Sequence, residues 1–225
     1  MKRSEINNYL RRAEEVVALH NFKLPPFAYW TPQDWANIGT DCDEIRDNML
    51  GWDVAALASE ESTEGTLVFF TIRNGNQHDE KYTKTYAEKI MIIDEGQTCP
   101  LHFHWSKMED IINRGGGNML MKLYNSTPDG ELADTDVTVS VDGRKLTVEA
   151  GGVIRLLPGE SVTLPVGMYH SFWAEDGLGT VFAGEVSQCN DDKTDNRFYI
   201  PRARFPVVEE DEPPYRYLCT EYPTK

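Results

Sequence analysis

The sequence lacks three features, and each absence excludes a class of protein. Its four cysteines, Cys42, Cys99, Cys189 and Cys219, lie far apart and form no C-x-x-C pair, which argues against zinc-finger and thioredoxin-like sites. No apolar run reaches the length of about 18 residues that a membrane-spanning helix needs. The first residues contain no apolar segment of the kind found in signal peptides. We therefore expect a soluble, cytoplasmic protein with reduced thiols.

An excess of positive charge is also missing. Lys and Arg together number 22 against 37 Asp and Glu, for a formal charge of −15. Nucleic acid and anionic membranes are therefore poor partners for this surface. An acidic balance is compatible with a bound divalent cation, although acidity alone usually serves solubility. At 225 residues with 40% hydrophobic side chains, the chain can bury the core of one domain with extensions.

The N-terminal part, residues 1–65, reads as a helical extension that packs on the main body. An apolar face repeats at helical spacing over residues 4–20, with Ser4 as the expected cap. Thr31 and Pro32 carry the signature of a second, short helix. Residues 41–60 show no clear period, and we expect irregular or short helical structure there.

The central part, residues 66–200, is rich in short β patterns. Turns containing glycine, proline and aspartate separate segments with strand character, at 67–72, 87–94, 101–105, 118–124, 137–141, 153–156, 161–164, 170–174 and 180–186. Many short strands at regular spacing predict a mainly β sandwich or barrel. Residues 201–225 form a C-terminal extension, and its interspersed apolar residues Phe205, Val207, Tyr215 and Leu218 predict that it packs along the body.

Three of the five histidines suggest a metal site. His102 and His104 lie two positions apart in a predicted strand, so that both side chains point to one face. Glu109 follows five residues later, and His170 begins a later strand after a Pro-Gly turn. A lone His-x-His could equally be two ordinary strand histidines. Three imidazoles and one carboxylate suit manganese, iron, cobalt, nickel or zinc, and spacing does not choose among them.

The spacing of these residues resembles the two motifs of the cupin superfamily. The first motif falls on Gly96, His102, His104, Glu109 and Gly116, and the second on Gly159, Pro165, Gly167 and His170. Ala174 stands where the second motif has an asparagine. The resemblance implies a cupin-type β-barrel (a double-stranded β-helix, or jelly roll) with N-terminal helices and a C-terminal extension. It also implies that His102, His104, Glu109 and His170 are the metal ligands.

A closer resemblance, to the D-lyxose isomerase family of cupins, covers most of the chain. It rests on residues 88–97, 102–117, 164–173 and 184–187 and on both extensions. It implies an aldose–ketose isomerase that interconverts D-lyxose and D-xylulose, and also D-mannose and D-fructose. The implied cofactor is Mn²⁺, with Co²⁺, Zn²⁺, Fe²⁺ or Ni²⁺ as alternatives. The implied substrate is an unphosphorylated monosaccharide, and the implied assembly is a homodimer.

Glu185 is the predicted catalytic base. Aldose–ketose interconversion through an enediol needs a base for the carbon-bound proton and a group that stabilises the oxyanion. Val181, Ala183 and Glu185 share one face of an apolar strand, so that burial should raise the pKa of the Glu185 carboxyl towards a useful value. The competing interpretation is a rim carboxylate in a surface salt bridge.

Lys89 is the predicted catalytic helper. It shares a strand face with Ala87, Met91 and Ile93, which would place its amine in the barrel interior. There it could stabilise the enediolate or relay the oxygen-bound proton. The competing interpretation is a lysine that extends to the barrel mouth.

Other polar and aromatic residues are candidates for binding the sugar. Lys107 follows the histidine pair closely and could contact the sugar or pair with a nearby acid. Trp173 lies in the aromatic strand that His170 begins. Asp191, Asp192 and Arg197 follow Glu185 and could bind sugar hydroxyls.

Three other functions compete with the isomerase. A cupin dioxygenase would consume oxygen and depend on iron. A non-catalytic sugar-binding cupin would bind its ligand without turnover. A phosphosugar isomerase would need a cluster of basic side chains for the phosphate, whereas Arg155, Arg197, Arg202 and Arg204 are scattered along the sequence.

Overall fold

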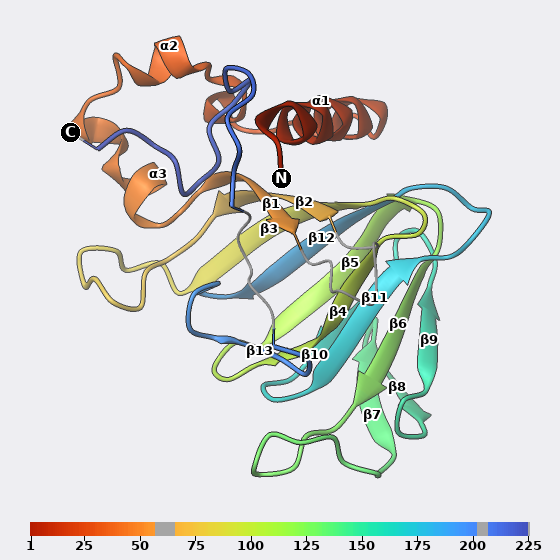
Figure 1. Ribbon diagram of the computed structural model, residues 1–225. Coiled ribbons are helices and arrows are strands. Elements are labelled where there is room, and N and C mark those ends of the chain that lie inside the picture. Colours follow the sequence, from red (N-terminus) through yellow and green to blue (C-terminus); the bar gives the residue numbers. More distant parts are fainter. Residues whose placement is uncertain (57–65, 202–206, 225) are drawn as a thin grey trace.

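Two antiparallel sheets face each other, and a helical layer covers the outside of one of them (Figure 1). This computed structural model describes residues 1–56, 66–201 and 207–224. Phe205, Arg202 and Arg204 lie outside the described residues. No helix in the described part of the chain is long and apolar enough to cross a membrane.

The larger sheet has eight strands. In spatial order they are β1 (Gly51–Ala56), β2 (Thr66–Arg73), β3 (Tyr86–Ile93), β12 (Val181–Gln188), β5 (Glu109–Gly116), β10 (Ser161–Leu164), β7 (Val137–Val141) and β8 (Arg144–Val148). The smaller sheet has five, in the order β13 (Asn196–Phe198), β4 (Thr98–His104), β11 (Tyr169–Ala174), β6 (Met119–Tyr124) and β9 (Val153–Leu156). The mainly β, two-sheet barrel predicted from the sequence is thereby confirmed.

Four strands were not expected from the sequence: β1, β5, β8 and β13. Residues 41–60 were predicted to be irregular or helical, which is wrong for β1, because its Trp52 pairs with Phe70 of β2. Strand β5 is rich in polar residues and glycine, which have low strand propensity. It forms because β12 and β10 hydrogen-bond to it from both sides. In β5, pairing with distant segments therefore outweighed local propensity.

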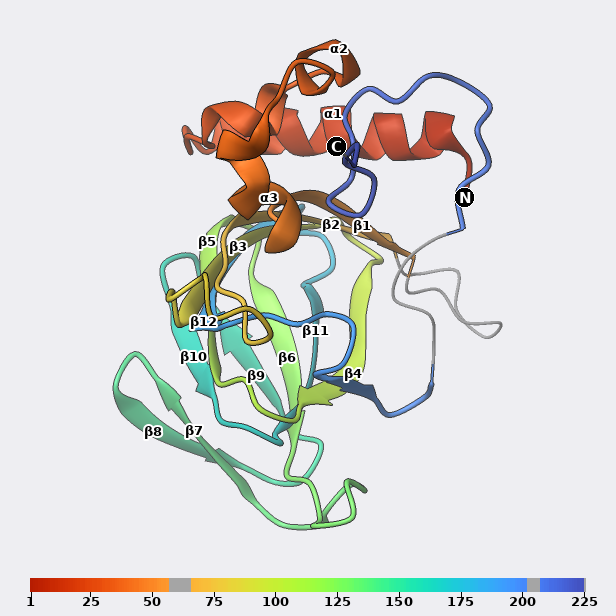
Figure 2. The same ribbon diagram turned by 90° about the vertical axis from the view of Figure 1, so that its left-hand side faces the viewer.

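The helical layer consists of α1 (Arg3–Leu19), α2 (Pro32–Trp35), α3 (Asp43–Asp47) and the 3₁₀ turns Pro26–Tyr29 and Thr40–Cys42. Figure 2 shows α1 lying across the top of the larger sheet. Thr31 caps α2 as predicted. The Ser4 cap of α1 is wrong: Lys2 is the N-cap, and its N–H donates to the Glu5 carboxylate. The Ser4 hydroxyl instead donates to Asp211 of the C-terminal segment.

Two apolar cores hold these layers together. The inner core fills the space between the sheets and includes Met91, Ile111, Leu123 and Phe172. The outer core lies between the larger sheet and the helical layer, and its buried members include Ile6, Leu10, Val17, Trp52, Phe70 and Phe182. The predicted apolar face of α1 is confirmed, and Trp52 of β1 packs in the same core.

The C-terminal segment packs on α1 and on the N-terminal segment. The Arg3 guanidinium, almost fully buried, pairs with Glu210 at 2.7 Å and with Glu221 at 2.6 Å. Leu218 belongs to the outer core, while Val207 is 89% exposed and does not pack as predicted. The division of the chain near residues 65 and 200 stays a proposal, and β1 shows that the N-terminal segment also contributes an edge strand.

Candidate active site

Three histidines converge between the sheets. His102 and His104 extend from β4, and His170 from the neighbouring strand β11, where it pairs directly with His102. All three are buried. One ring nitrogen from each lies within 4.8 Å of the others. Equal parity along β4 and the register between β4 and β11 thus bring the three imidazoles together.

Hydrogen bonds fix the proton positions of two of these rings. His102 Nδ1 lies 2.7 Å from the Pro100 carbonyl oxygen, and His170 Nδ1 lies 3.0 Å from that of Met168. A carbonyl oxygen only accepts, so each Nδ1 donates and each Nε2 keeps a free lone pair. Burial lowers the pKa of His102 and of His104. Neutral imidazoles with free lone pairs are the form that binds a metal ion.

Glu109 completes the donor set at the start of β5. Its Oε1 atom lies 3.2 Å from His104 Nε2 and 3.0 Å from His170 Nε2. Glu109 Oε1 and His170 Nε2 are both buried and have no hydrogen-bond partner among the described residues. Buried polar atoms without partners are rare, and a cation would satisfy both of these atoms at once. Three imidazoles and one carboxylate therefore could hold a divalent metal ion.

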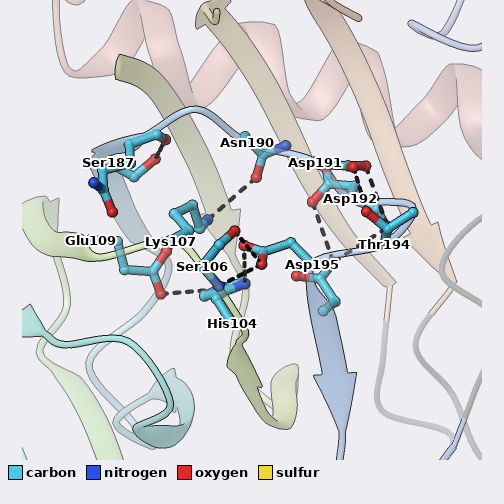
Figure 3. Close-up of polar contacts among 12 residues, drawn as sticks. His104, Ser106, Lys107, Glu109, Ser187, Asn190, Asp191, Asp192, Thr194 and Asp195 are labelled. Atoms are coloured by element: carbon cyan, nitrogen blue, oxygen red, sulfur yellow. Dashed lines mark hydrogen bonds and ion pairs between the residues drawn. The ribbon is translucent and has the colours of Figure 1, made fainter. Parts of the chain in front are cut away.

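Lys107 lies between two buried carboxylates. Its Nζ is 2.9 Å from Glu109 Oε2 and 2.7 Å from Glu185 Oε1, and it also donates to Asn190 Oδ1 at 3.3 Å. Figure 3 shows this amine pointing into the site between Glu109 and the loop that carries Asn190. Burial disfavours the charge of Lys107, but the surrounding carboxylates outweigh burial and raise its pKa. Of the two roles considered for Lys107, pairing with nearby acids is the one observed.

Glu185 is buried in β12, as predicted from the apolar face of this strand. Besides Lys107, Ser187 Oγ donates to its Oε1 atom at 3.0 Å. The predicted rise of its pKa is wrong. Burial would raise the pKa of Glu185, but the ammonium groups of Lys107 and Lys89 outweigh burial and lower it. Glu185 is therefore ionised at neutral pH and is not a surface carboxylate.

Lys89 lies directly across from Glu185 in the register between β3 and β12. Its side chain is 4% exposed, and its Nζ is 3.3 Å from Asp192 Oδ2. Both Lys89 and Asp192 line the same cavity as the three histidines, Lys107 and Glu185. The interior location predicted for Lys89 is confirmed.

Three of the predicted substrate-binding residues lie elsewhere. Trp173 has the opposite parity to His170 in β11 and borders a separate hollow beside Gly96. Asp191 faces His78, whose Nε2 is 3.0 Å away. Arg197 donates to the Gly130 carbonyl oxygen and to Glu131. None of the three is among the residues that line the cavity.

Residues that were not predicted from the sequence hold the loop between β12 and β13. Asn74, which is buried, accepts from the Asn190 N–H at 2.9 Å and donates to the Asn190 carbonyl oxygen at 2.9 Å. Asn74 also exchanges hydrogen bonds with Asn48. These amides tie the N-terminal segment to the residue that contacts Lys107. An Asn-Gly pair is an ordinary turn signal, so the sequence carried no distinct sign of this role.

The fold and the site together define a cupin-type β-barrel protein with a three-histidine, one-glutamate centre at the cavity. Comparison with known proteins narrows this class. The D-lyxose isomerase family matches residues 1–222. Proteins named D-lyxose/D-mannose isomerase from Escherichia coli O157:H7 and Serratia proteamaculans are each 47% identical over 223 residues, covering 99% of this chain and 98% of theirs. The chain belongs to the D-lyxose isomerase family and is an aldose–ketose isomerase.

Solved structures agree in fold. L-ribose isomerase from Cellulomonas parahominis, without ligand and with L-ribose, aligns with a TM-score of 0.58 at 16% identity, covering 93% of this chain and 98% of that one. L-ribose isomerase from Acinetobacter sp. DL28 in complex with L-ribose aligns with a TM-score of 0.51 at 15% identity, over 88% of this chain and 92% of that one. At such identities the likeness supports the cupin-type barrel alone.

Proposed function

We propose that this enzyme interconverts D-lyxose with D-xylulose, and D-mannose with D-fructose, by moving a proton between C1 and C2 through a cis-enediol. The observation that carries the proposal is the buried pair Lys107 and Glu185 beside the histidine centre, 2.7 Å apart. This pair supplies a base and an acid in one cavity. The names of the two relatives with 47% identity support these substrates.

We assign His102, His104, Glu109 and His170 as ligands of a divalent ion, and we propose Mn²⁺. Co²⁺, Zn²⁺, Fe²⁺ and Ni²⁺ accept the same donors. The unpartnered Glu109 Oε1 and His170 Nε2 support the assignment. When bound, the ion would act as a Lewis acid towards the sugar oxygens O1 and O2.

Glu185 is the group to which we assign the carbon-bound proton. Its carboxylate takes the proton from C2 of the open-chain aldose, and the electron pair of that C–H bond forms the C1–C2 double bond. The C1 carbonyl bond breaks towards O1, which takes up a proton. O2 then loses its proton as the C2 carbonyl forms, and Glu185 returns the carbon-bound proton to C1. Atoms and electrons balance without an oxidant or reductant.

Lys107 and Lys89 are the groups to which we assign stabilisation of the developing oxyanion. Both are buried in the cavity, and both have acidic partners that hold them in place, Glu185 and Asp192 respectively. In such a low-dielectric site, a fixed ammonium acts more strongly on a developing negative charge than it would in water. The side chains of Phe69, Met91, Ile111, Phe172 and Phe198 contribute an apolar wall that limits water around them.

We also propose that the enzyme works as a homodimer in the cytoplasm. The support is the family resemblance, together with the four cysteines, which form no disulfide among the described residues, as expected for a reducing compartment.

Ketose formation tests the proposed function directly. We expect protein stripped of metal to be inactive, and Mn²⁺ to restore ketose formation from lyxose and mannose ahead of xylose, glucose and ribose. No ketose from any sugar with any of the five metals would contradict the isomerase proposal. Oxygen consumption that depends on iron, followed with an oxygen electrode, would instead support a dioxygenase. Tight binding of a sugar without turnover would support a non-catalytic binding protein.

Replacing His102 by alanine is expected to abolish stoichiometric metal. The variant removes one of three converging imidazoles, and the remaining donors leave an open position in the shell. Metal content after gel filtration, measured by mass spectrometry, checks the result. His78→Ala is the matched control, because His78 is exposed and faces Asp191 outside the centre. Full metal content in His102→Ala would contradict the ligand assignment.

A further inference from the structure

His104 differs from the other two histidines in how its second ring nitrogen is held. His102 and His170 each donate Nδ1–H to a backbone carbonyl. His104 Nδ1 is buried without a hydrogen-bond partner in the described part of the chain. Asp195 Oδ2 lies 3.9 Å from this nitrogen. That oxygen is also buried and lacks a partner among the described residues. Buried polar atoms normally have a hydrogen-bond partner, and these two face each other as a matching donor and acceptor.

Asp195 is itself held firmly. Its Oδ1 atom accepts from both the backbone N–H and the hydroxyl of Ser106, each at 2.7 Å. Its carbonyl oxygen accepts from the Trp105 N–H at 3.0 Å. These bonds fix the carboxylate immediately beyond His104, at the start of β13, so that only Oδ2 remains to face the imidazole. Figure 3 shows the Asp195 carboxylate beside Ser106 and His104.

We propose that Asp195 is a positioning residue that sets the tautomer and orientation of His104 for metal binding. A carboxylate beyond Nδ1 favours the tautomer with the proton on Nδ1, which leaves the Nε2 lone pair directed at the ion. The carboxylate also makes the imidazole a more basic metal ligand than a backbone carbonyl in its place would.

The same contact links metal binding to the loop between β12 and β13. This loop carries Asn190, which contacts Lys107, and Asp192, which contacts Lys89. Asp195 ends that loop, and its backbone N–H donates to the Asp191 carbonyl oxygen. The loop that holds the partners of both lysines therefore ends beside His104, where Asp195 is bonded to Trp105 and Ser106.

Asp195→Asn tests the inference, which rests on the proposed metal centre. The asparagine oxygen can keep both hydrogen bonds from Ser106, but its amide then presents a donor to His104 Nδ1 and favours the wrong tautomer. Outer partners of metal-ligating histidines typically change metal affinity by about 10- to 100-fold. We expect the Mn²⁺ dissociation constant, measured from free Mn²⁺ by electron paramagnetic resonance, to rise by that factor. The melting temperature of the metal-free protein should stay close to wild type.

Two controls separate positioning from a general effect on the fold. Asp129→Asn makes the same chemical change on an exposed turn and should leave the Mn²⁺ dissociation constant unchanged. In a His104→Ala background, Asp195→Asn should cause no further loss of affinity, because its effect acts through that ring. The absorption spectrum of the Co²⁺-loaded protein should change in Asp195→Asn and not in Asp129→Asn.

Two results would overturn the inference. One is Mn²⁺ affinity of Asp195→Asn within about twofold of wild type, against the range expected of an outer partner. The other is an equal loss of affinity with and without His104. If wild-type protein itself fails to bind Mn²⁺, Co²⁺ or Ni²⁺, the metal centre is refuted, and this inference falls with it.

Discussion

Glu185→Gln is expected to lower kcat by a factor on the order of 10³, since general acid–base groups typically contribute about 10²- to 10⁴-fold. The amide oxygen can still accept from Lys107 and Ser187, so the local structure should persist. The variant should keep its metal, because Glu185 is not among the assigned ligands. A steady-state assay of ketose formation and a metal analysis of the same sample check both halves of the expectation.

Isotope exchange sharpens this test. In D₂O, an enzyme that removes the C2 proton incorporates deuterium into the sugar even where ketose accumulates slowly. Glu185→Gln should lose this exchange together with turnover, because both depend on the same proton transfer. Glu88→Gln is the matched control: Glu88 lies on β3 next to Lys89, but it pairs with Arg73. Near-normal kcat or exchange in Glu185→Gln would place the base on another residue.

Lys107→Met is expected to destabilise the metal-free protein by about 3–5 kcal/mol at neutral pH, the usual cost of removing one partner from a buried ion pair. The substitution keeps an unbranched side chain, one atom shorter, but leaves Glu109 and Glu185 buried without their shared cation. Denaturant unfolding followed by fluorescence measures the change. Lys84→Met is the control, because the Lys84–Glu44 pair is partly exposed and such pairs contribute about 0–1 kcal/mol.

Lys107→Met should become more stable as the pH falls, whereas the wild type becomes less stable at low pH. In the wild type, Lys107 holds the pKa of Glu109 and Glu185 below the ordinary value. Their contribution is therefore present above pH about 4.5 and is lost as the pH falls through the folded-state pKa. Without Lys107, burial raises both pKa values, so lowering the pH from 7 towards 5 should make the variant more stable. A variant that loses stability over this range would contradict the ion-pair account.

The sequence patterns whose predictions the structure confirms are those that repeat over a few residues. Parity along β4 placed His102 and His104 on one face, and the Pro-Gly turn before β11 delivered His170 to the same point. The apolar face of α1 and that of the strand bearing Glu185 were readable for the same reason. In a helix, side chains three or four positions apart lie on the same face, and in a strand, side chains two positions apart do so. Neither relation depends on the rest of the chain.

Strand pairing and charge compensation depended on distant segments instead. The ion pair between Lys107 and Glu185 joins residues 78 positions apart, and it reversed the expected pKa shift of the base. Asp195 reaches His104 only because β13 pairs with β4. Trp173, in contrast, shares the strand of His170 but faces the other way.

The sequence by itself therefore predicted the ligands of the proposed metal centre and the carboxylate beside it, because strand parity and the motif spacing that carries the family resemblance are local properties. Only the tertiary structure decided which charges meet inside the cavity, and hence that Lys107 lies between Glu109 and Glu185. The physical reason is that the register between strands fixes contacts across long sequence separations, and electrostatic effects in a buried site depend on those contacts.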